Sequence, residues 1–157
     1  MSKISLKKIR SLKKNKIGIS ALTSYDASFA KLADNCGIDI ILVGDSLGEV
    51  IQGYPNTHSV TMNDMCYHTK IVSRAIQKAF LIADMPKNSY KTKSQALKNA
   101  KKLIANNMAD MVKIEFKEKD TEVIKYLIVH KIPVCLHIGV LPQTIKSKSG
   151  YKKVGKT

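Results

Sequence analysis

The chain has 157 residues, 44% of them hydrophobic, and carries 27 lysines and arginines against 12 aspartates and glutamates, a formal charge of +15. This size predicts a single domain, residues 1–157, with its own apolar core. No segment approaches the roughly 18 consecutive apolar residues of a membrane span, and the basic start lacks the apolar stretch of a signal peptide. We therefore expect a soluble, cytoplasmic protein with no membrane partner.

Neither the positive charge nor the cysteines indicate a special class of protein. The lysines are spread along the whole chain, mostly on the polar faces of expected helices and in turns. None of the common nucleic-acid-binding motifs is present, and aromatic residues are scarce, so we expect no nucleic-acid partner. Cys36, Cys66 and Cys135 are odd in number and far apart, which is typical of reduced thiols in a cytosolic protein.

Along the chain, apolar runs of strand length alternate five times with segments of helical periodicity. A basic helix is expected at about 5–14, ahead of the first strand. Residues 45–60 are expected to form a long loop, and Thr61 to open a helix with Asp64 as its capping-box partner. Two later helices are expected to begin at Thr92 or Ser94 and at Asp120 or Thr121. The strands are expected at 17–22, 38–44, 80–83, 111–114 and 134–138.

This alternation predicts an α/β fold with parallel strands, specifically part of a TIM (β/α)8-type barrel: a leading helix and the first five β/α units. Five units in this length give about 31 residues each, which agrees with the roughly 250 residues of a complete eight-unit barrel. About three further units, on the order of 90 residues, are therefore expected to be missing. The polar segment 146–157 is expected to be a loop.

Ionisable residues follow the ends of four successive strands: Asp45, Asp84, Glu115 and His137. In a barrel the carboxyl ends of the strands and the loops after them form the active-site face. Three carboxylates brought together repel one another unless a proton or a cation compensates them. We therefore predict a divalent-metal site, with Mg²⁺ favoured by the oxygen ligands. The alternative is that each aspartate only caps a following turn or helix.

Other polar residues near these strand ends give weaker signals. Lys113 lies two residues before Glu115, so both side chains are expected to face the barrel mouth, where the ammonium group could bind a substrate carboxylate. Ser46 could hydrogen-bond to the same carboxylate or be an ordinary turn residue, and Tyr25 is more typical of packing. Gly44 and Gly48 do not form a phosphate-binding loop. Surface or helix positions are expected for the remaining histidines, His58, His68 and His130.

Six segments in order resemble the ketopantoate hydroxymethyltransferase family, nearly from end to end. They are TSYDASFAKL at 23–32, LVGDSLG at 42–48, VTMNDMCYHT at 60–69, ADMP at 83–86, MVKIE at 111–115 and PVCLHIGVLPQ at 133–143. The resemblance implies a (β/α)8 barrel that assembles as a decamer and uses Mg²⁺. It also implies transfer of a hydroxymethyl group from 5,10-methylenetetrahydrofolate to 3-methyl-2-oxobutanoate, giving 2-dehydropantoate for pantothenate biosynthesis through a Mg-stabilised enolate.

The resemblance also implies roles for particular residues. Asp45, Asp84 and Glu115 would surround the metal, some of them through water. Ser46 and Lys113 would bind the oxo acid together with the two aspartates, and His137 would be the catalytic residue beside the reacting carbon. In the family a glutamate from the later part of the barrel accepts the proton, and no residue here corresponds to it. We therefore expect this chain to have little or no activity by itself.

The chain departs from the family pattern beside these motifs. Lys87 and Asn88 follow the ADMP segment, Phe116 and Lys117 replace a glycine pair, and leucines stand at 136 and 141 in place of Gly and Thr. Larger residues in place of glycine can block a close backbone approach, which affects substrate fit and folate docking. Two alternative functions remain open: a related metal-dependent 2-oxo-acid lyase or aldolase, and a non-catalytic basic binding module.

Overall fold

The computed structural model describes residues 2–145, and the expected loop at 146–157 lies outside the described residues. The chain begins with helix α1 (Leu6–Lys14), as predicted. The Ser5 side chain accepts a hydrogen bond from the Lys8 amide and so caps the first turn, while Lys13 and Lys14 lie at the carboxyl end, where the helix dipole favours positive charge.

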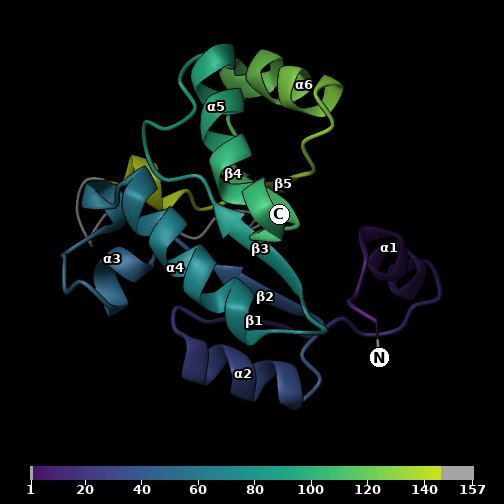
Figure 1. Cartoon of the computed structure of the whole chain (residues 1–157). Helices are drawn as coiled ribbons and strands as arrows, with labels where there is room; N and C mark the ends of the chain where they lie inside the picture. Colours follow the sequence, from purple (N-terminus) through teal and green to yellow (C-terminus); the bar gives the residue numbers. More distant parts are fainter. Residues whose placement is uncertain (1, 146–157) are drawn as a thin grey trace.

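Five parallel strands form one sheet in the order in which they occur along the chain. Each strand pairs with the one before it, so the sheet winds in a single direction, as in a barrel, and does not reverse as in doubly wound folds. This arrangement confirms the predicted partial barrel, and Figure 1 shows the progression. The strands are β1 (Ala21–Thr23), β2 (Ile40–Val43), β3 (Phe80–Asp84), β4 (Met111–Glu115) and β5 (Val134–His137).

The longer helices connect successive strands and begin at the predicted positions. The Thr61 and Asp64 capping box is present, the Thr92 side chain caps its helix, and Asp120 stands at the last N-cap without a side-chain hydrogen bond. These helices are α2 (Ala27–Asn35), α4 (Met62–Ala75), α5 (Lys93–Ile104) and α6 (Thr121–Val129). Within residues 2–145, no helix is both long and apolar enough to cross a bilayer.

Three segments differ from the prediction. The first two strands start later than expected because Ser20 and Asp39 bond to each other: the Ser20 amide and hydroxyl both donate to Asp39 Oδ2 at 2.9 Å, so pairing begins at Ala21 and Ile40. The expected loop 45–60 instead contains two short helices, α3 (Leu47–Val50) and η1 (Thr57–Ser59). Further 3-10 turns are η2 (Ala105–Asn107), η3 (Glu118–Asp120) and η4 (Pro142–Thr144).

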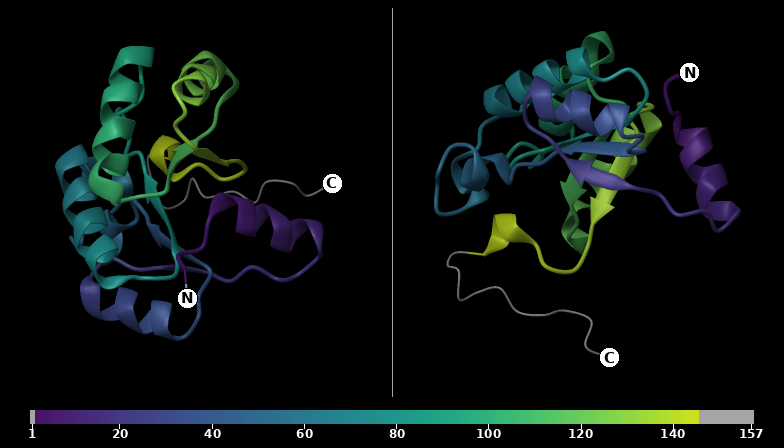
Figure 2. Two further views of the ribbon diagram at one scale, coloured as in Figure 1. Left: turned by 45° about the vertical axis from the view of Figure 1, so that its right-hand side comes forward. Right: turned by 90° about the horizontal axis from the view of Figure 1, so that it is seen from below.

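Alternate residues of each strand face opposite sides of the sheet, and the two sides bury different partners. Leu81 and Ala83 of β3 pack into the main core beneath the connecting helices. Phe80 and Ile82 face the other way and pack with residues from α1, such as Ile9. Figure 2 shows α1 apart from the layer of connecting helices. This alternation puts Asp84 on the same side as Phe80 and Ile82, which is the inner side of a barrel.

A buried aspartate holds the chain just before β3. Asp34, at the end of α2, is 2% exposed and accepts hydrogen bonds from the backbone amides of Gln77, Lys78 and Ala79 at 2.7–3.0 Å. Burial acts to raise the pKa of Asp34, but the three amide hydrogen bonds outweigh it and the pKa is lowered. The carboxylate therefore joins α2 to the start of the strand that supplies Asp84.

Candidate active site at the carboxyl ends of the strands

The four ionisable groups predicted at strand ends all lie at the same edge of the sheet. Asp84, Glu115 and His137 are the last residues of β3, β4 and β5, and Asp45 comes two residues after β2. In the strand register, Asp84 pairs with Lys113, and Glu115 pairs with His137. Because the strands are parallel, these side chains gather at one end of the partial barrel.

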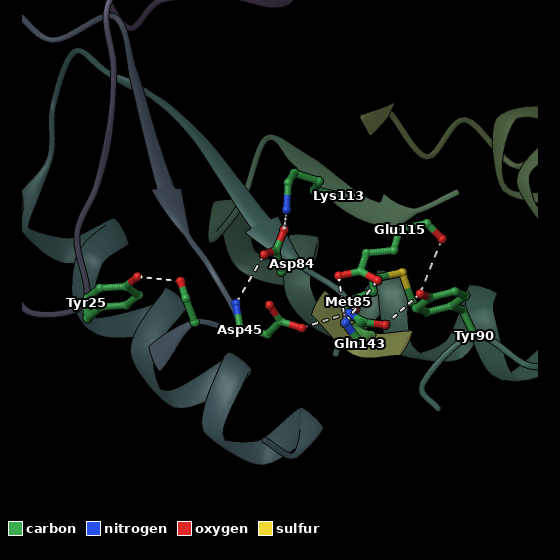
Figure 3. A network of polar contacts seen from close by, with 9 residues as sticks. Tyr25, Asp45, Asp84, Met85, Tyr90, Lys113, Glu115 and Gln143 are labelled. Atoms are coloured by element: carbon green, nitrogen blue, oxygen red, sulfur yellow. Dashed lines mark hydrogen bonds and ion pairs between the residues drawn. The ribbon is translucent and has the colours of Figure 1, made fainter. Parts of the chain in front are cut away.

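Asp84 is the centre of the cluster on β2, β3 and β4. One of its oxygens, Oδ1, lies 2.5 Å from Lys113 Nζ, and the other, Oδ2, accepts a hydrogen bond from the Asp45 backbone amide at 3.1 Å. Asp84 and Asp45 are 4% and 6% exposed, so both carboxyl groups are largely removed from water. Figure 3 shows the Lys113 ammonium group directed at the Asp84 carboxylate.

Gln143, which we did not predict as a site residue, joins the two ends of the cluster. Its side-chain nitrogen donates to Asp45 Oδ2 at 2.8 Å and to the Met85 carbonyl at 3.0 Å. Its backbone amide donates to both oxygens of Glu115, at 3.0 and 3.1 Å. Gln143 is buried in η4, and its side-chain oxygen accepts a hydrogen bond from the Tyr90 hydroxyl at 2.7 Å. The turn after β5 therefore lies between Asp45 and Glu115 (Figure 3).

The electrostatics of the cluster favour uptake of positive charge. Burial, together with the nearby Asp84 carboxylate, raises the pKa of Asp45 to about 7, although Gln143 and Lys113 act in the opposite direction. Burial also raises the pKa of Glu115, against the effect of the Gln143 backbone amide. A carboxyl group whose pKa is raised by burial and by a second carboxylate is stabilised as an anion when a cation lies close to it.

The donors at this edge suit a hard divalent cation in chemistry, but they are not gathered into one three-ligand site. Asp45 and Asp84 are adjacent, whereas Glu115 is held on the far side of Gln143 by the amide hydrogen bonds. Among residues 2–145, no three His, Cys, Asp or Glu side chains lie close enough together to hold one metal ion. Oxygen ligands from two aspartates are compatible with Mg²⁺, which retains several waters in protein sites. The predicted ligand role of all three carboxylates stays a prediction.

Tyr25 and Ser46 form a separate contact beside the aspartates. Their hydroxyl oxygens are 2.7 Å apart, so Tyr25 makes a polar contact in addition to the packing role that we expected. Gly44 lies in the same turn, and a Cβ atom at this position would be 2.8 Å from Ser46 Oγ and 3.4 Å from Asp84 Oδ2. A side chain at position 44 would therefore displace the Ser46 hydroxyl group from its present place beside the cluster.

The histidines differ in their surroundings. His137 is half-buried at the end of β5, and burial lowers its pKa, which favours the neutral imidazole. His58 and His68, expected at surface or helix positions, are half-buried and contact the Pro142 and Tyr25 carbonyl oxygens at 3.3 and 2.7 Å. His130 is exposed at the carboxyl end of α6, as expected.

Fold and site together define the class of protein: part of a parallel β/α barrel with a buried cluster of carboxylates and one lysine at the carboxyl ends of its strands. The sequence matches the ketopantoate hydroxymethyltransferase family over residues 3–157, and the chain belongs to this family. It is 50% identical over 155 residues to the 3-methyl-2-oxobutanoate hydroxymethyltransferase of Thermoanaerobacter sp. (strain X514), covering 98% of this chain and 57% of that protein. The enzyme of the same name from Nitrosococcus oceani is 45% identical over 156 residues, covering 99% and 59%.

The chain therefore spans somewhat more than half the length of the curated relatives that it matches.

Among solved structures, 2,3-dimethylmalate lyase, described as a PEP mutase/isocitrate lyase superfamily member, is similar with a TM-score of 0.62 and 17% identity, over 83% of this chain and 51% of that one. Phosphonopyruvate hydrolase, in a complex with oxalate and Mg²⁺, has a TM-score of 0.58 and 16% identity, over 72% and 40%. At such identities the likeness shows the fold alone.

Proposed function

We propose that the protein takes part in transferring a hydroxymethyl group from 5,10-methylenetetrahydrofolate to 3-methyl-2-oxobutanoate, giving 2-dehydropantoate. The observation that carries this proposal is the 50% identity to a transferase of that name along nearly the whole chain. The matched region, 98% of this chain, includes the strand ends at which Asp45, Asp84 and Lys113 gather. The lyase alternative has only a likeness in fold to support it, since the solved lyase is 17% identical.

Asp45 and Asp84 would hold Mg²⁺, with Glu115 contributing through water. Support comes from their hard oxygen atoms, their burial and the raised pKa of Asp45, all of which favour a bound cation. When bound, Mg²⁺ supplies electrostatic stabilisation for negative charge that develops on the keto oxygen of the substrate. Gln143 would keep Asp45 and Glu115 in fixed positions during the reaction, because it bonds to both.

Lys113 would bind the carboxylate of the 2-oxo acid, with Ser46 as a second hydrogen-bond donor. The ion pair with Asp84 holds the ammonium group at the strand ends. Tyr25 orients the Ser46 hydroxyl through their 2.7 Å contact. His137 would lie beside the reacting carbon, where its lowered pKa favours the neutral form that is able to accept or relay a proton.

Binding can be tested separately from turnover. Calorimetric titration of the 157-residue chain with 3-methyl-2-oxobutanoate in the presence of Mg²⁺ should give saturable binding that is lost with EDTA. Lys113→Met should weaken this binding by at least tenfold, and Lys125→Met, on the exposed face of α6, should leave it unchanged. Equal binding with and without metal, or by the Lys113 variant and its control, would refute the proposed site.

We further propose that turnover needs the rest of the barrel, and that the complete assembly is a cytoplasmic homo-oligomer, a decamer as the family resemblance implies. The chain covers 57% of its Thermoanaerobacter relative, so the remaining segment of that relative can be supplied as a second polypeptide. Mixed with both substrates and Mg²⁺, the pair should form 2-dehydropantoate, whereas this chain alone should not. Ordinary turnover by this chain alone would contradict this part of the proposal, and cleavage of an oxo acid without folate would favour the lyase.

A further inference from the structure

A cavity opens beside the carboxylate cluster, and Glu115 and Gln143 of that cluster form part of its wall. Its volume is about 330 Å³, which lies in the range of small-ligand pockets. The loops after β3 and β4 and the turn η4 form its walls, so it lies at the same edge of the sheet as the candidate active site. Four lysines line it: Lys87, Lys91, Lys117 and Lys119.

The positive charges of this cavity are only partly offset by its own acidic residues. Glu115 and Asp120 also line it, so two carboxylates stand against four lysines. Among the residues that the structure describes, the four ammonium groups have no carboxylate within 4 Å. The cavity therefore has a surplus of positive charge.

Two further features favour an anion in this cavity. Helix α6 begins at Thr121, and Asp120 and Val123 from its amino-terminal end line the cavity, so the positive end of the helix dipole lies beside it. Tyr90 and Gln143 form part of the wall and are fixed to each other by a 2.7 Å hydrogen bond. Burial raises the pKa of Tyr90, so this hydroxyl group stays protonated at neutral pH.

The cavity is also where several departures from the family pattern come together. Lys87, Asn88 and Lys117, which were singled out in the sequence for replacing the family's usual residues, all line it although they come from different loops. Asn88 has a φ of 69°, which turns the loop after β3 beside Lys87.

We infer that this cavity binds a small, multiply charged anion through the four lysines. The ligand class is a compact molecule with two or more phosphate or carboxylate groups, because four lysines line a space of about 330 Å³. The inference does not depend on the proposed transferase activity, since binding in this cavity needs neither the oxo acid nor a metal.

Calorimetric titrations of the 157-residue chain with pyrophosphate and with citrate, at low salt and without Mg²⁺, test the inference. At least one of them should bind with a stoichiometry of one and a Kd below about 1 mM. Tighter binding of pyrophosphate would assign a phosphate ligand, and tighter binding of citrate a polycarboxylate. The double variant Lys87→Gln, Lys117→Gln should weaken binding at least tenfold.

The matched control is Lys101→Gln, Lys102→Gln, which removes the same charge from the exposed face of α5, outside the cavity. It should change the affinity less than twofold. Equal weakening by both double variants would overturn the inference, because only the net charge would then matter. Absence of saturable binding by the unchanged chain would overturn it as well. Circular dichroism and thermal melting of each variant establish that it is folded before it is titrated.

Discussion

Asp45→Asn should make the stability of the fold less sensitive to pH. The substitution removes a buried negative charge and keeps a side-chain oxygen that can accept the Gln143 hydrogen bond. In the folded chain the pKa of Asp45 is about 7, against 3.8 for an ordinary aspartate. Because the pKa is higher in the folded chain, folding favours the protonated form of Asp45. The contribution of Asp45 to the free energy of unfolding is therefore complete below pH 3.8 and is lost as the pH rises to about 7.

The size of the effect follows from the shift. Each pH unit between the two pKa values changes the free energy of unfolding by about 1.36 kcal/mol. Of the range from pH 5 to pH 8, only the two pH units from 5 to 7 lie between the two pKa values of Asp45. Over this range the free energy of unfolding of the unchanged chain should therefore fall by about 3 kcal/mol more than that of the Asn variant. Urea unfolding followed by circular dichroism, with EDTA present, measures this difference at both pH values.

Asp64→Asn is the matched control for this experiment. Although burial acts to raise the pKa of Asp64, its hydrogen bonds to Thr61 lower it, so this group titrates below pH 5. The difference between control and unchanged chain should therefore be the same at pH 5 and pH 8. If the Asp45 variant behaves like the control, Asp45 is not held in its protonated form and the argument for a cation at the cluster loses its electrostatic basis.

Three further predictions concern residues that hold the fold around the site. Gln143→Ala should lower the free energy of unfolding by about 2 kcal/mol, since it leaves buried hydrogen-bonding groups without a partner. The control Gln95→Ala, at a half-buried residue whose two hydrogen bonds lie in exposed surroundings, should lower it by less than about 1 kcal/mol, and similar values from urea unfolding would contradict this. Lys113→Met should lower the free energy of unfolding by about 3 kcal/mol, because it leaves Asp84 buried and unpaired. Adding Asp84→Asn should restore most of that free energy. If the effects of the two substitutions simply add, the ion pair is unimportant for stability. Asp34→Ala should lower the free energy of unfolding by about 3 kcal/mol at pH 7, because three amide hydrogen bonds are lost. This difference from the unchanged chain should shrink as the pH falls through the lowered pKa of Asp34. A difference that stays the same down to pH 3 would argue against this role.

The features that could be predicted from the sequence are those determined by local patterns. Apolar runs bounded by polar residues marked the strands, and the carboxyl end of each run placed Asp84, Glu115 and His137 correctly. The Thr61 capping box depends on residues three apart, and it was also predicted correctly. Parallel pairing in chain order then follows from the repeated alternation of strands and helices.

The features that were missed depend on contacts between distant residues. Gln143 was noted only as the last residue of the family-like segment 133–143, and only the folded chain brings it to Asp45 and Glu115. The late start of β1 comes from Ser20 bonding to Asp39, which the strand pattern does not reveal. The helices within 45–60 are too short for their periodicity to be recognised.

The contact between Gln143 and Asp45 also constrains the order in which the protein is made. The two residues are 98 positions apart, so at ordinary ribosomal rates of about 5–20 residues per second the aspartate emerges about 5–20 seconds before its amide partner. During that interval β2, β3 and β4 can pair, while the acidic edge of the sheet is still open to water. The polar cluster is therefore completed only after the segments that form β2, β3 and β4 have been made.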